Sequence, residues 1–181
     1  MKRAIFLDRD GVLNRSEMRN GKPFAPQRLS DFRLLPGAAD AVARLKQRGF
    51  LILVVTNQPD IENGKVPTSV VEAMHDRLMS RTAVDDVLMC PHSQSAGCRC
   101  RKPKSGLVRL AARRWDIDLL ASYMVGDRSS DMVAGNRVGC YTIFVDRRYA
   151  DGPRAVSDAQ VGSLRQAVEI IVQRERVIRE P

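Results

Sequence analysis

Two carboxylates one residue apart, Asp8 and Asp10, follow an apolar run at residues 4–7 and come just before Gly11. Residues two apart on an extended backbone point in the same direction, so both carboxylates can face one site. Paired carboxylates at this spacing suit a hard divalent cation, and one of them can also serve as a nucleophile. The alternative is an Asx-rich turn that only closes the end of a strand.

Two further polar clusters follow apolar runs later in the chain. Thr56 and Asn57 end one such run, and Asp127 and Asp131 come after another. In open α/β sheets, ligands bind beyond the carboxyl ends of the strands, and adjacent parallel strands end at the same edge. We therefore expect these clusters to converge with the first carboxylate pair on one cleft, although each cluster alone could be an ordinary turn or a helix cap.

Lys102, in the basic segment 101–104, can bring positive charge to this cleft. A divalent cation, a carboxylate nucleophile, hydroxyl and amide donors and a lysine are together the groups needed for phosphoryl transfer. Lys102 could instead be a solvated surface charge. The coincidence of all these groups at strand ends favours a common site over a series of separate turns.

A short loop carries four side chains of the types that bind zinc. Three thiols and one imidazole offer a closed tetrahedral set for a structural zinc ion, supplied by Cys90, His92, Cys98 and Cys100. The spacing differs from the usual two-residue knuckle, so spacing alone leaves the assignment open, and disulfides are a poor alternative in a cytoplasmic chain. His75, on a helix rich in charge, is expected at the surface.

The elements that position these residues alternate between strands and helices. A capping box of Ser69 and Glu72 is predicted at the start of one helix. The alternation predicts an α/β fold, a Rossmann-like parallel sheet with helices on both faces. Apolar runs predict strands at 4–7, 50–55, 87–89, 123–125 and 141–145, and amphipathic spacing predicts helices at 37–48, 69–78, 105–115, 132–138 and 163–172.

The polar stretch 15–36 is predicted to form a loop or small hairpin over the site. Because the segment between Asp10 and Thr56 already includes a helix and a strand, no large cap domain fits there. The active site is therefore expected to be open and shaped by loops. One domain spanning residues 1–181 accounts for the whole pattern.

Composition narrows the class of partner. Thirty Lys and Arg against 21 Asp and Glu give a formal charge of +9, which favours anionic partners, and only 5% of the residues are aromatic, which leaves few stacking platforms for single-stranded nucleic acid. No apolar segment has the length of a signal peptide core or a membrane span. We expect a cytoplasmic monomer that binds neither nucleic acid nor membrane.

Four motifs, in the order FLDRDGVLN, VVTNQ, CPHSQSAGCRCRKP and YMVGDRSSDM, lie between residues 4 and 134. With them the chain resembles the haloacid dehalogenase-like phosphatases, in the branch that holds D-glycero-D-manno-heptose 1,7-bisphosphate phosphatase and histidinol-phosphatase. The resemblance implies a phosphoric monoester hydrolase. It also strengthens the assignment of a zinc-binding loop at residues 90–100.

The resemblance assigns roles to the residues of the cleft. Asp8 would be the nucleophile that forms an aspartyl-phosphate, and Asp10 would be the general acid/base. Mg²⁺ would be held by Asp8, the backbone carbonyl of Asp10 and Asp127, and Asp131 would support the site without binding the metal. The transferring phosphoryl group would be bound by Thr56 and Asn57, with Lys102 neutralising charge beside the nucleophile.

The choice of substrate rests on conflicting signals. The segment 90–106 has no Asp or Glu and four cations, which would repel the ammonium and imidazole of histidinol phosphate but could hold a second phosphate through Arg101 or Arg99. The short spacing between His92 and Cys98, and Asn63 where an arginine is expected, favour histidinol-phosphatase instead. We give charge more weight and predict a heptose 1,7-bisphosphate.

A different class of function is a basic zinc module that binds nucleic acid, because cations surround the predicted zinc loop. That alternative leaves four aspartates unexplained, Asp8, Asp10, Asp127 and Asp131. Carboxylates that converge on a phosphate backbone without a metal ion would repel it. The phosphatase hypothesis accounts for both the acidic and the basic residues.

Overall fold

A computed structural model of the chain describes residues 1–150 and 155–179. Its centre is a six-stranded sheet in the order β5-β4-β1-β6-β7-β8, in which every pair of neighbours is parallel. The strands are β1 (Ala4–Leu7), β4 (Leu51–Asn57), β5 (Asp86–Cys90), β6 (Tyr123–Gly126), β7 (Tyr141–Val145) and β8 (Ala159–Val161).

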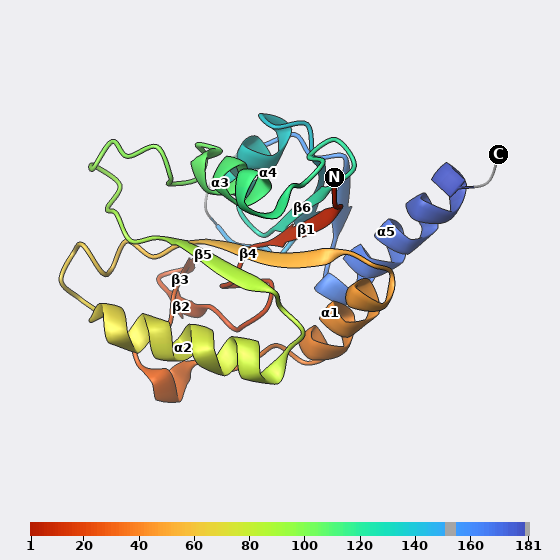
Figure 1. Ribbon diagram of the computed structural model, residues 1–181. Coiled ribbons are helices and arrows are strands. Elements are labelled where there is room, and N and C mark those ends of the chain that lie inside the picture. Colours follow the sequence, from red (N-terminus) through yellow and green to blue (C-terminus); the bar gives the residue numbers. More distant parts are fainter. Residues whose placement is uncertain (151–154, 180–181) are drawn as a thin grey trace.

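Helices cover both faces of this sheet (Figure 1). Three of them, α1 (Ala38–Gln47), α2 (Thr68–Arg81) and α5 (Leu164–Arg179), bury apolar side chains in one core with Ile5 and Leu7 of β1. On the other face α3 (Gly106–Trp115) packs against Phe6 of β1, and α4 (Ser129–Asn136) contacts β6 and β7. The predicted Rossmann-like α/β fold is confirmed.

The central strand β1 lies between β4 and β6, and all four of its residues are buried. Its last residue, Leu7, is paired with Val54 of β4 and Val125 of β6. The three strands therefore reach their carboxyl ends side by side. The predicted convergence of polar clusters follows from this register, because each cluster begins within three residues of these positions.

A two-stranded antiparallel hairpin, β2 (Glu17–Arg19) and β3 (Lys22–Phe24), occupies the stretch after β1. Asn20 and Gly21 both have positive φ, 51° and 73°, as a two-residue hairpin turn requires. A 3₁₀ helix, η1 (Leu29–Asp31), follows. The prediction of a small hairpin without a large cap domain is confirmed.

Several details of the elements differ from the sequence-based prediction. The capping box of Ser69 and Glu72 is wrong, since α2 begins one residue earlier after Pro67 and no side chain caps it. The helix α4 begins at Ser129 rather than at residue 132, which places Asp131 in its first turn. The short edge strand β8 was not predicted, because three residues carry too little apolar periodicity. No helix among the described residues is long and apolar enough to cross a membrane.

Candidate active site

The ends of β1, β4 and β6 contribute side chains to the lining of a cavity of about 520 Å³, whereas Thr56, Asp127 and Asp131 are buried and are not among its lining residues. Asp8 follows β1 directly, Thr56 and Asn57 end β4, and Asp127 follows β6. The cavity wall also includes the hairpin β2–β3 and the loop after the cysteines. Residues of the predicted site in its lining are Asp8, Asp10, Asn57, Arg101 and Lys102.

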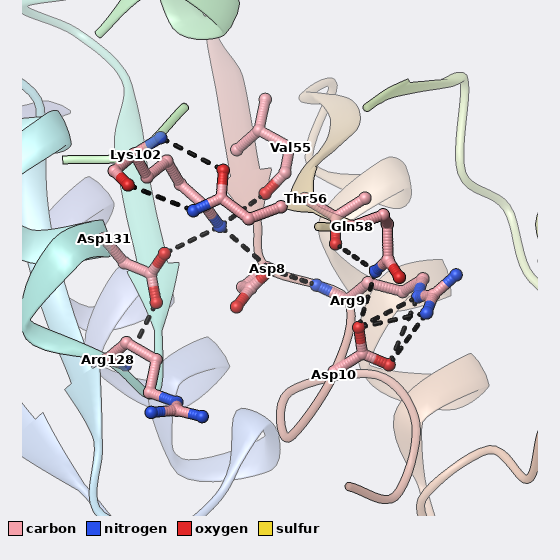
Figure 2. Close-up of polar contacts among 10 residues, drawn as sticks. Asp8, Arg9, Asp10, Val55, Thr56, Gln58, Lys102, Arg128 and Asp131 are labelled. Atoms are coloured by element: carbon pink, nitrogen blue, oxygen red, sulfur yellow. Dashed lines mark hydrogen bonds and ion pairs between the residues drawn. The ribbon is translucent and has the colours of Figure 1, made fainter. Parts of the chain in front are cut away.

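The Lys102 ammonium lies between Asp8, Asp131 and the carbonyl of Val55 (Figure 2). It lies 2.9 Å from Asp8 Oδ1 and 2.7 Å from Asp131 Oδ1, and it donates a 2.6 Å hydrogen bond to the carbonyl of Val55. Burial acts to lower the pKa of Lys102, but the carboxylates of Asp131 and Asp8 outweigh it and raise the pKa above the usual lysine value. Lys102 is therefore a permanent positive charge beside Asp8.

The side chain of Asn57 fixes the backbone that carries this lysine. Its Nδ2 donates to the Lys102 carbonyl at 3.0 Å, and its Oδ1 accepts from the Lys102 N–H at 3.0 Å. Two reciprocal hydrogen bonds hold the loop in register with the end of β4. Asn57 thus positions Lys102 as well as lining the cavity.

Asp8, Asp127 and Asp131 form a buried cluster in which one oxygen of each lies within 4.8 Å of the others. Burial, together with Asp131 and Asp10, raises the pKa of Asp8 to about 6 against the opposing charge of Lys102. Burial and the charges of Asp8 and Asp131 raise the pKa of Asp127 well above its usual range. Like charges this close favour a bound cation.

Asp127 shows the best fit for a metal ion. No described residue makes a hydrogen bond of standard geometry to either of its buried carboxylate oxygens, and the Tyr149 hydroxyl beside it offsets only part of the rise in pKa. Gly11, at φ 86°, makes room for this carboxylate, because a Cβ there would lie 1.8 Å from Asp127 Oδ2. Unpaired oxygens in an acidic, oxygen-rich pocket suit Mg²⁺.

Asp131 is held on both sides. Its Oδ1 pairs with Lys102, and its Oδ2 accepts a 3.0 Å hydrogen bond from the backbone N–H of Arg128, which caps the start of α4. These two contacts position the side chain without help from a metal ion. They agree with the expected supporting role of Asp131, although its oxygens also lie close enough to the others to bind a cation.

A dense hydrogen-bond network surrounds the Asp10 carboxylate. Arg9 Nε and Nη2 lie 3.0–3.2 Å from both oxygens, and Asn14 Nδ2 donates to Oδ1 at 2.8 Å. Gln58 Nε2 lies 2.8 Å from Asp10 Oδ2 and equally close to Thr56 Oγ1, so this amide connects the two strand ends. Sequence reasoning missed Arg9, Asn14 and Gln58, although all three lie within the quoted motifs.

The prediction that His75 is a surface residue is wrong. His75 is only 9% exposed, and its Nε2 lies 3.1 Å from Arg9 Nη1. Burial and the Arg9 charge lower its pKa to about 4. The inward position follows from helical spacing, because Val71 and Leu78, one turn away on either side, are buried on the same face of α2.

The four predicted zinc ligands converge. Cys100 Sγ lies 3.1 Å from both Cys90 Sγ and His92 Nδ1, and Cys90 Sγ lies 3.7 Å from Cys98 Sγ. All the cysteines are free thiols. Burial opposes the change, but the backbone N–H of Arg101 and the neighbouring thiols lower the pKa of Cys98 to about 7. Three thiols and an imidazole gathered around one point fit a tetrahedral zinc ion.

Of the two arginines predicted to bind a second phosphate, only one is in the cavity lining. Arg101 lines the cavity, whereas Arg99 is exposed and is not among the lining residues. Sequence reasoning missed further cations of the lining, which the fold brings in from the hairpin, the loop after β4 and the start of α4: Lys22, Lys65 and Arg128. The cavity lining therefore carries several cations besides Lys102, although Asp60, which pairs with Lys65, also lines it.

Comparison with known proteins agrees with this geometry. A family model described as HAD-hydrolase-like matches residues 99–159. D-glycero-beta-D-manno-heptose-1,7-bisphosphate 7-phosphatase of Pseudomonas putida is 36% identical over 148 residues, 79% of this chain and 82% of the relative. D-glycero-alpha-D-manno-heptose-1,7-bisphosphate 7-phosphatase of Mycobacterium bovis is 36% identical over 176 residues, 89% of this chain and 87% of the relative.

A solved structure resembles the whole fold. The crystal structure of D,D-heptose 1,7-bisphosphate phosphatase from B. bronchiseptica, complexed with magnesium and phosphate, superposes with a TM-score of 0.82 at 33% identity. The match covers 96% of this chain and 99% of that one. The likeness therefore extends over the sheet, both helical layers and the loops around the cavity.

Proposed function

Because the chain belongs to the haloacid dehalogenase-like phosphatases, in the family of the D-glycero-D-manno-heptose-1,7-bisphosphate 7-phosphatases, we propose that it removes the 7-phosphate of this sugar bisphosphate. The observation that supports the proposal most directly is the buried Asp8–Lys102–Asp131 arrangement beneath a cationic cavity. It supplies a carboxylate nucleophile whose charge is offset where a phosphate would approach.

Three groups would hold Mg²⁺: the carboxylates of Asp8 and Asp127 and the backbone carbonyl of Asp10. When bound, the ion neutralises part of the charge on the phosphate and on the nucleophile. The pocket fits it because the Asp127 oxygens have no hydrogen-bond partner of standard geometry among the described residues. Lys102 supplies a second, fixed positive charge 2.9 Å from Asp8 Oδ1.

In the first step, an Asp8 oxygen attacks phosphorus while the bond to the sugar oxygen breaks. The leaving alkoxide takes a proton from Asp10, which lines the cavity. Thr56 and Asn57 at the end of β4 bind the phosphoryl oxygens. Lys102 offsets the negative charge that builds up as the aspartyl-phosphate forms.

In the second step, water hydrolyses the aspartyl-phosphate. Asp10, now a carboxylate, accepts a proton from the attacking water, and the bond between phosphorus and the Asp8 oxygen breaks. Inorganic phosphate leaves and Asp8 returns to its starting form. The network of Arg9, Asn14 and Gln58 keeps the Asp10 carboxylate at one place between the two steps.

The second phosphate of the substrate would be held by Arg101. Arg101 lines the cavity and its guanidinium can contact a phosphate in bidentate fashion. Arg99 lies on the same loop but outside the cavity lining, so we expect it to contribute less than Arg101 to binding the second phosphate. The same positive charge disfavours histidinol phosphate, whose organic part is cationic at neutral pH.

The thiols and imidazole of Cys90, His92, Cys98 and Cys100 would hold a structural Zn²⁺. Four protein ligands complete a tetrahedral shell, which leaves no position for substrate. The ion would tie β5 to the loop that ends in Lys102.

We also predict that the protein acts as a cytoplasmic monomer and binds neither nucleic acid nor membrane.

The deciding experiment compares kcat/KM for D-glycero-D-manno-heptose 1,7-bisphosphate, in both anomers, with kcat/KM for histidinol phosphate. We expect the heptose bisphosphate to be the better substrate and the product to retain its 1-phosphate, as ³¹P NMR of the product can show. Faster hydrolysis of histidinol phosphate would overturn the substrate and leave only the phosphatase activity.

A further inference from the structure

We propose that His75 is a positioning residue for the acid/base step: it holds the Arg9 guanidinium, which in turn holds the Asp10 carboxylate. The inference rests on the proposed function, in which Asp10 exchanges protons with the leaving group and with water. His75 lies on α2, 66 residues away from Arg9 in the chain. The contact therefore connects a helix outside the catalytic motifs to the acid/base residue.

Arg9 is the link in this chain of contacts. It is fully buried, so its guanidinium N–H groups need partners inside the protein. Nε and Nη2 face the two oxygens of Asp10, Nη1 faces His75 Nε2 at 3.1 Å, and the Phe32 ring lies 5.7 Å from the guanidinium carbon. Contacts on three sides fix the plane of the guanidinium, and that plane directs its two parallel donors toward Asp10.

His75 acts here as a neutral acceptor. The low pKa of its buried imidazole, about 4, leaves a lone pair on Nε2 to accept from Arg9, with the proton on Nδ1. An apolar side chain at this position would leave an Arg9 N–H buried without a partner. The guanidinium would then turn toward another acceptor, and its alignment with the Asp10 oxygens would be lost.

Removing the His75 contact should weaken the positioning of Asp10 without abolishing it. Asn14 and Gln58 still donate to the Asp10 oxygens at 2.8 Å each, so the carboxylate stays in the cavity but is held less firmly. A loosely held acid protonates a poor leaving group less effectively, because general acid catalysis depends on the distance and direction of the proton transfer. A leaving group that is already stable as an anion needs no such proton.

The test compares kcat/KM on the heptose bisphosphate with kcat/KM on 4-nitrophenyl phosphate, whose phenolate leaves without protonation. For His75→Leu we expect a loss of about tenfold or more on the heptose bisphosphate, a part of what a well-placed acid contributes, and little change on the aryl ester. His75→Gln, whose side-chain oxygen can accept from Arg9, should recover most of the loss. Leu78→Val, one turn further along α2 and also buried, is the control for damage to the helix.

An equal loss on both substrates, or a His75→Leu enzyme that behaves like Leu78→Val, would overturn the role of His75 while the phosphatase assignment stands. If the unaltered protein releases phosphate from neither ester, the proposed function fails and this inference fails with it. Should His75→Leu not fold, His75→Ala measured against His75→Gln gives the same comparison, and similar ratios for the two variants would again refute the proposal.

Discussion

Lys102 Nζ lies 2.9 Å from Asp8 Oδ1, and both side chains are almost completely withdrawn from solvent. The lysine also pairs with Asp131, so one buried cation serves two buried carboxylates. Lys102→Met should therefore abolish activity and lower the free energy of unfolding by about 3–5 kcal/mol, since it leaves buried charge uncompensated. Denaturant unfolding measures the loss. Arg113→Met, at an exposed position of α3, should change neither quantity.

Asp8→Asn should leave the fold intact and reduce phosphatase activity by several orders of magnitude. An amide cannot form the covalent aspartyl-phosphate, while its size matches that of the carboxylate it replaces. Circular dichroism checks that the fold is intact, and steady-state phosphate release measures the remaining activity. Activity within a few-fold of the parent enzyme would show that Asp8 is not the nucleophile.

Zinc should be found at about one ion per chain, and Cys98→Ser should remove it together with thermal stability. The ion would stabilise the loop because its predicted ligands come from both ends of that loop. Elemental analysis and thermal melts provide the readout. Cys140→Ala is the matched control, since Cys140 is buried in the core away from the four predicted ligands and its loss should leave the zinc content unchanged.

Arg101→Ala should raise KM for the bisphosphate more than it lowers kcat. The side chain is assigned to the phosphate that is retained, and a hydrogen bond to a charged group contributes about 1.5–3 kcal/mol, or roughly tenfold to a hundredfold in KM. Arg99→Ala tests the same loop with an arginine outside the cavity lining, and we expect a smaller effect. Equal effects of the two variants would contradict the assignment.

Stability should depend on pH through His75. Its pKa falls from the usual 6.5 to about 4 in the folded protein, so between these values the unfolded chain binds a proton that the folded chain does not. The contribution of neutral His75 to the free energy of unfolding is complete above pH 6.5. It is lost as the pH falls toward 4, with a slope of at most about 1.4 kcal/mol per pH unit. Because the raised pKa of Asp8 acts in the opposite direction over this window, the measurement compares two proteins: in denaturant titrations, the free energy of unfolding of the parent minus that of His75→Gln should fall as the pH falls from 6.5 to 4.

The sequence alone predicted the parts of the site that depend on strand ends. Asp8, Thr56 and Asp127 follow apolar runs, and a parallel sheet must bring such residues to one edge. The Arg9–His75 contact could not be predicted in this way, because it joins a loop to a helix face whose orientation depends on packing. The spacing from Val71 to His75 gave a signal of burial that the charge of the helix obscured.

Asn57 connects the proposed phosphate site to the predicted zinc loop through a very short piece of chain. Its two hydrogen bonds hold Lys102, and only one residue separates Lys102 from Cys100, a predicted zinc ligand. We predict that zinc in the cysteine loop and phosphate in the cavity affect each other's binding, and thermodynamic linkage would make that influence mutual. If zinc tightens phosphate binding by some factor, phosphate in the cavity must tighten zinc by the same factor, so a working enzyme would resist chelators better than an idle one.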